Sequence, residues 1–163
     1  MTKIIILADK KDSHQDKLKW LISELQKRDS DIIVPCIDSE DSFDSLFKQL
    51  SQELAPDTLI VAKGIIARLL LKRLETFSAG VKGLFIITDE TNKHEILELD
   101  YSKIKKRVMK FFIYAFQNNH DFPLTEAHEL ADKIEAELFV LEGAEDYSDY
   151  EDILIDILSL ENE

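Results

Sequence analysis

Few residues of this chain have the side chains for acid–base or nucleophilic chemistry. Histidine is the most common general base near neutral pH, and the histidines are His14, His94, His120 and His128. The hydroxyls that fall in loops at the expected ends of strands are Ser13, Thr88, Thr91 and Ser148. A nucleophile must lie within hydrogen-bond reach of its base, and none of these hydroxyls follows a strand at a sharp turn. The spacing therefore favours no catalytic serine among them.

The other reactive side chains favour structural interpretations. Cys36 is the one cysteine, which excludes an internal disulfide and a multi-cysteine zinc site. It is more typical of a small buried apolar residue than of a reactive thiol. Oxygen-bearing side chains that would suit Mg²⁺ or Ca²⁺ are Asp9, Asp12, Asp38, Asp89, Asn119 and Asp146. With 33 acidic residues in the chain, such grouping is expected by chance, so we predict no metal site.

Phosphate-binding motifs are absent from the sequence. Neither a Gly-x-Gly-x-x-Gly loop nor a Walker lysine loop occurs, and the loop from Asp9 to His14 contains no glycine to bring backbone N–H groups close to a phosphate. A receiver-type phosphorylation site needs an aspartate after the third strand, where Ala62-Lys63-Gly64 stands instead. We therefore expect no nucleotide and no other cofactor.

Length and composition exclude further classes. The chain has 163 residues, which fits one domain over residues 1–163. Its net charge of -13 argues against a nucleic-acid partner, because affinity for phosphate needs a surface rich in Lys and Arg. No apolar run approaches the roughly 20 residues of a membrane-spanning helix. The first residues have too short an apolar part for a signal peptide, so we expect a cytoplasmic protein.

Charge is unevenly distributed along the chain. Basic residues gather at Lys103, Lys105, Lys106, Arg107 and Lys110, whereas residues 142–163 contain many acidic side chains and no Lys or Arg. The pattern predicts solvated helix faces. A protein-docking surface is the alternative interpretation, and the sequence does not select its partner.

Apolar periodicity predicts how these residues are positioned. Runs rich in Ile, Val, Leu and Phe predict strands over residues 3–8, 32–37, 58–62, 83–88, 111–116 and 137–141. They show little polar alternation, which is typical of strands buried on both faces of a parallel sheet. Stripes at helical spacing predict helices over residues 18–25, 43–54, 65–74, 127–134 and 150–158. Alternating strands and helices predict an α/β fold, a three-layer αβα sandwich. Residues 89–101 are polar and are expected to be irregular.

Segments spread over nearly the whole chain match one known family in order and spacing. They are Lys19-Trp20-Leu21 with Ile33-Val34-Pro35, Leu59 to Gly64, Val81 to Ile87, Asn119 to Pro123 with Ala127 to Ala131, and Ala136 to Ala144. In these segments the sequence resembles the small single-domain serine hydrolases of the retinoblastoma-binding-protein type, in the α/β-hydrolase superfamily. The resemblance implies a minimal α/β-hydrolase-like domain with six mostly parallel strands in the order 2-1-3-4-5-6.

The sequence departs from this family at each position of the catalytic triad. The family's nucleophile is the serine of a Gly-x-Ser-x-Gly elbow, and the matching residue here is Gly64. The acid position, four residues before Pro123, holds Asn119, which lacks the charge that stabilises an imidazolium. The histidine position holds Asp146, and Leu7-Ala8-Asp9 stands where the family has a His-Gly pair after its first strand. The resemblance therefore implies vestigial triad positions at Gly64, Asn119 and Asp146, and no catalytic residue.

Gly64 also has a physical explanation of its own. An elbow residue takes an unfavourable backbone conformation, and glycine adopts positive φ at little steric cost. A chain that keeps the turn but does not need the hydroxyl would lose strain by having glycine there. The alternative interpretation is that Gly64 merely begins the third helix. We expect Lys63 to neutralise Glu145 or Asp146 across a vacant pocket. Its expected lining is Asp9, His14, Lys63, Ile65, His120 and Glu145.

Three functions follow from these observations. We favour a non-catalytic α/β-hydrolase-fold protein that acts as a binding or interaction module for an unknown protein or small ligand. Phe122 and Tyr147, near the vacant pocket, are the apolar residues expected to face a partner. One alternative is an active hydrolase of small esters or amides with a relocated triad. The other is a flavodoxin-like small-ligand-binding module, which a sheet ordered 2-1-3-4-5 without a sixth parallel strand would favour.

Overall fold

The computed structural model describes residues 2–9, 16–28, 30–35, 40–88, 99–116, 124–141 and 147–163. Its strands form a single six-stranded sheet in the order β2-β1-β3-β4-β5-β6, and every adjacent pair is parallel. The strands are β1 (Lys3–Leu7), β2 (Asp31–Ile33), β3 (Leu59–Lys63), β4 (Val81–Ile87), β5 (Val108–Phe116) and β6 (Glu137–Leu141). The predicted α/β class, the strand order and the parallel sheet are confirmed. The sixth parallel strand, β6, counts against the flavodoxin-like alternative.

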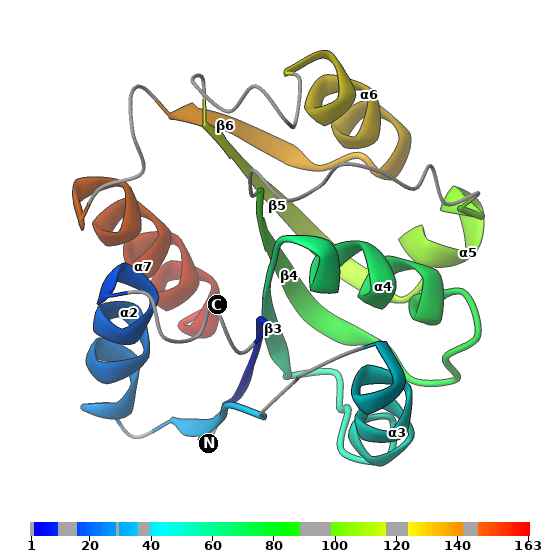
Figure 1. The fold of residues 1–163 in the computed structure, drawn as a ribbon, viewed down its shortest axis with the longest axis horizontal. Helices are drawn as coiled ribbons and strands as arrows, with labels where there is room; N and C mark the ends of the chain where they lie inside the picture. The colour runs from blue at the N-terminus through cyan, green and yellow to red at the C-terminus, as the bar shows by residue number, and fades with distance from the viewer. Residues whose placement is uncertain are drawn as a thin grey trace.

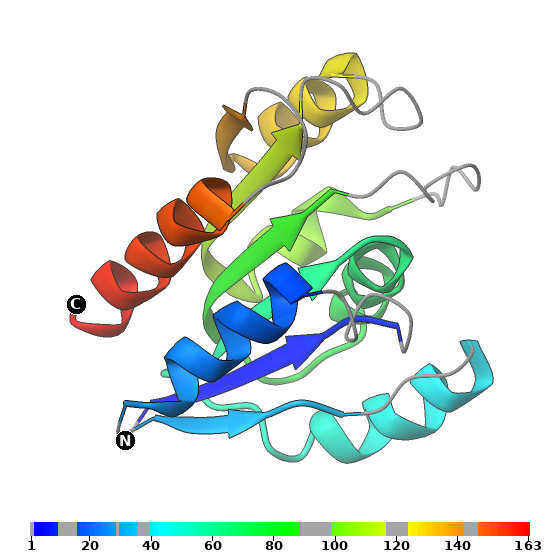
Figure 2. The same cartoon turned by 60° about the vertical axis from the view of Figure 1, so that its left-hand side comes forward.

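Helices cover both faces of the sheet and make the three predicted layers (Figure 1). They are α2 (Asp16–Gln26), α3 (Glu40–Leu50), α4 (Ile65–Leu74), α5 (Tyr101–Lys105), α6 (Leu124–Ile134) and α7 (Tyr147–Glu161). On one face α2 and α7 lie side by side, and on the other face lie α3, α4, α5 and α6. Figure 2 shows the strands running behind α2 and α7.

Side-chain alternation along the strands divides the core into two halves. In β1, Ile5 and Leu7 join the apolar cluster beneath α3 and α4, whereas Ile4 and Ile6 join the cluster beneath α2 and α7. All four side chains are essentially inaccessible to solvent. Successive residues of a strand point to opposite faces of the sheet, so a strand buried on both faces must be apolar throughout. This is why the central strands have uninterrupted apolar sequences.

Several elements differ in their bounds from the sequence predictions. The strand predicted over residues 32–37 is the shorter β2, which ends at Ile33, two residues before Pro35. The short helix α5 was not predicted and overlaps the predicted irregular stretch only at Tyr101, and β5 begins at Val108, three residues before the predicted strand. The N-cap of α5 is Asp100, whose side chain accepts a hydrogen bond from the backbone N–H of Lys103 at 3.2 Å. An aspartate in this position satisfies a backbone donor that the first turn leaves unpaired.

Helix α7 packs closely against the sheet at Gly83 in β4. A Cβ atom built on Gly83 would lie 2.4 Å from Cδ2 of Leu160 in α7 and 3.3 Å from Cδ2 of Leu59 in β3. Leu160 is itself buried, with 3% of its surface exposed. The sheet therefore accepts α7 at this distance because residue 83 has no side chain.

We predict that Gly83→Ala lowers the free energy of unfolding by about 1–3 kcal/mol, because the added methyl group overpacks a filled core. Leu160→Ala alone should also destabilise, by about 2–5 kcal/mol, because it leaves a cavity. In the double variant the cost should be clearly less than the sum, since the smaller residue at 160 makes room for the methyl group. Urea denaturation of the four proteins measures this coupling. Strict additivity, or no effect of Gly83→Ala, would contradict the close approach of α7.

Candidate functional site

The candidate site lies at the carboxyl ends of β1 and β3. From β1 the sheet order continues to β2 on one side, and from β3 it continues to β4 on the other. In open α/β sheets the crevice at such a switch point is the usual place for a ligand. The structure brings Asp9, the second residue after β1, and Gly64, the first residue after β3, to this edge of the sheet.

Gly64 alone makes the turn from β3 into α4. Its backbone has φ 67° and ψ -140°, and it is the N-cap residue of α4. It is the one glycine with positive φ in the described part of the chain. Its N–H donates to the carbonyl of Ile87 at the end of β4 (3.0 Å), and its carbonyl accepts from the N–H of Ala67 (3.1 Å). A strand thus passes directly into a helix through one residue in a conformation that L side chains rarely adopt.

This turn has the architecture of a nucleophile elbow, in which the residue between strand and helix is held in a strained conformation at the sheet edge. In an elbow the side chain of that residue supplies the attacking hydroxyl, and Gly64 has none. Gly64 begins α4 and has positive φ, as both interpretations from the sequence require, so the structure does not separate them. The following residue, Ile65, is 40% exposed.

Lys63, immediately before the turn, is buried. Only 1% of its surface is accessible. Its ammonium Nζ donates to the hydroxyl of Tyr150 in α7 at 3.2 Å and lies 5.9 Å from the centre of the same ring. A charge removed from water needs such partners, since burial of an ammonium group is otherwise costly. Lys63 therefore attaches the start of α7 to the end of β3.

Thr88 is the described candidate hydroxyl closest in sequence to the end of β4, and it is not available as a nucleophile. It is 3% exposed, and its Oγ1 donates to the backbone carbonyl of Tyr114 at 3.0 Å. The N–H of Thr88 donates to the same carbonyl, also at 3.0 Å. The hydroxyl thus extends the pairing of β4 with β5, which is a structural role.

The described structure covers some of the predicted site residues. Gly64, Asp9, Lys63 and Ile65 all lie at the carboxyl edge of the sheet, with Asp9 partly buried. The other predicted positions lie outside the described residues and stay predictions: His14, Asn119, His120, Glu145 and Asp146. The predicted pairing of Lys63 with Glu145 or Asp146 is untested for the same reason. Of the remaining histidines only His128 is described, and it is exposed on α6 as expected.

Sequence reasoning missed the part played by Tyr150. It belongs to the apolar stripe that predicts the last helix, and it is completely buried there. A buried tyrosine hydroxyl usually finds a hydrogen-bond partner, and Lys63 is the one charged residue of an otherwise apolar strand. These two signals were present, but the sequence alone does not show that residues 63 and 150 meet.

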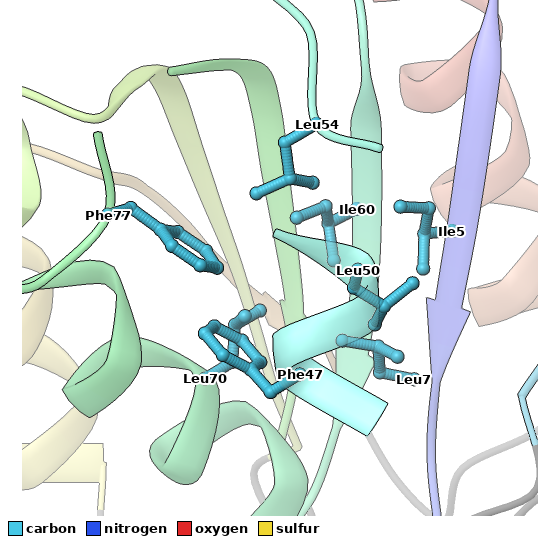
Figure 3. Close-up of a pocket in the computed structure, with 8 residues that line it drawn as sticks. All are labelled: Ile5, Leu7, Phe47, Leu50, Leu54, Ile60, Leu70 and Phe77. Carbon is cyan, nitrogen blue, oxygen red and sulfur yellow. The ribbon is translucent and has the colours of Figure 1, made fainter. Parts of the chain in front are cut away.

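Other kinds of site find no support in the described part of the chain. It contains no group of three or more His, Cys, Asp or Glu side chains that could hold a metal ion. Within the same residues, no helix combines the length and apolar character needed to cross a membrane. A cavity of about 10 Å³ lies between α3, α4 and the sheet, and its lining, including Phe47, Leu54 and Phe77, is entirely apolar (Figure 3). It is barely large enough for one water and has no polar partner for it, so we treat it as a packing defect.

Comparison with known protein structures identifies the fold of the chain. No known family model and no curated protein matches the sequence. The ydeN gene product from B. subtilis has a similar structure, with a TM-score of 0.78 and 19% identity over 98% of this chain and 97% of that chain. A predicted CIB-like hydrolase from Thermoplasma acidophilum is also similar, with a TM-score of 0.69 and 14% identity over 99% of this chain and 87% of that chain. The chain has an α/β-hydrolase fold.

We predict that Gly64→Ala lowers the free energy of unfolding by about 1–3 kcal/mol, because the backbone of residue 64 has a positive φ at which a Cβ atom causes steric strain. Ile65→Ala, one residue further on and exposed, is the control and should change stability by no more than about 0.5 kcal/mol. Chemical denaturation followed by circular dichroism measures both. If Gly64→Ala were as stable as the parent chain, the turn would not be strained and the elbow geometry would be wrong.

Proposed function

We propose that this chain is a non-catalytic α/β-hydrolase-fold protein that acts as a binding or interaction module. The observation that carries the proposal is Gly64, which occupies the positive-φ turn from strand to helix where this fold presents its nucleophile. A glycine supplies no oxygen to attack an acyl group. The backbone that would position the nucleophile is present, whereas the atom that would react is absent.

The resemblance to the small serine hydrolases of the retinoblastoma-binding-protein type extends the proposal. It assigns the acid and base positions to Asn119 and Asp146, neither of which has the chemistry of the triad. The loss of all three triad side chains supports the absence of catalysis more strongly than the loss of the nucleophile alone. We therefore propose a degenerate triad at Gly64, Asn119 and Asp146.

The side chains around the turn have structural roles at this edge of the sheet, which supports the proposal. The side chain of Lys63, the residue before Gly64, is buried and donates a hydrogen bond to the hydroxyl of Tyr150 in α7. The hydroxyl at the end of β4, that of Thr88, is engaged by the backbone of β5. Groups that would need freedom to bind substrate or transfer a proton are thus engaged in holding α7 and the strands together.

An active hydrolase is the second candidate, and one similar structure is that of a predicted CIB-like hydrolase. It would need a nucleophile other than residue 64. Among the described residues the accessible candidate hydroxyl is that of Ser148, which is exposed in the first turn of α7. Ser148→Ala is therefore the variant that separates the two functions if any turnover is found.

We predict that the chain hydrolyses p-nitrophenyl acetate and butyrate no faster than the same chain after heat denaturation, because residue 64 supplies no nucleophile. The denatured control contains the same lysines and histidines and accounts for unspecific acyl transfer. The triple variant Gly64→Ser, Asn119→Asp, Asp146→His should gain a weak activity that heating abolishes. Turnover by the parent chain that heating abolishes, and that Ser148→Ala removes, would overturn the proposal in favour of a relocated serine.

A further inference from the structure

We draw no further inference here: the strongest candidate, the Nε atom of Arg107 in the turn between α5 and β5, is buried without a hydrogen-bond partner in the described part of the chain, but it carries nothing because the atom is closed off from solvent and nothing among the described residues shows what ligand would reach it.

Discussion

The backbone conformation of Gly64 is the constraint on which the candidate site depends. With φ 67° and ψ -140°, one residue ends β3 and begins α4, so the strand and the helix leave no loop between them. The N–H of Gly64 bonds to the end of β4, which fixes the turn to the next strand as well. Because a positive φ strains every L side chain, glycine is the least costly residue there. An enzyme accepts that strain to present its serine, whereas this chain has the turn without it.

The buried contact between Lys63 and Tyr150 follows from the same turn. A strand that runs directly into the helix places its last side chain inside the fold, where an ammonium group must be hydrogen-bonded. Tyr150 supplies that partner from α7, and Gly83 lets α7 pack close to the sheet. Helix α7 thus covers one face of the sheet and is attached to the end of β3 next to the turn at Gly64.

Much of the fold could be predicted from the sequence, because strands buried on both faces must be apolar throughout. The β6 bounds agree with its apolar run, and the strand order followed from the family resemblance. The family resemblance also predicted the position of Gly64 at the elbow. The contact of Lys63 with Tyr150 could not be predicted, since it joins residues 87 positions apart and depends on how α7 packs.

The central proposal is that the elbow persists without its nucleophile, and covalent labelling tests it most directly. A fluorophosphonate probe reacts with serines activated by a general base, and mass spectrometry of the intact chain detects one bound probe per molecule. The chain should keep its unmodified mass in a mixture where an active serine hydrolase becomes fully labelled. A single adduct that forms on the folded chain, but not on a chain denatured before the probe is added, would contradict the proposal. The labelled residue would then be the serine that replaces residue 64.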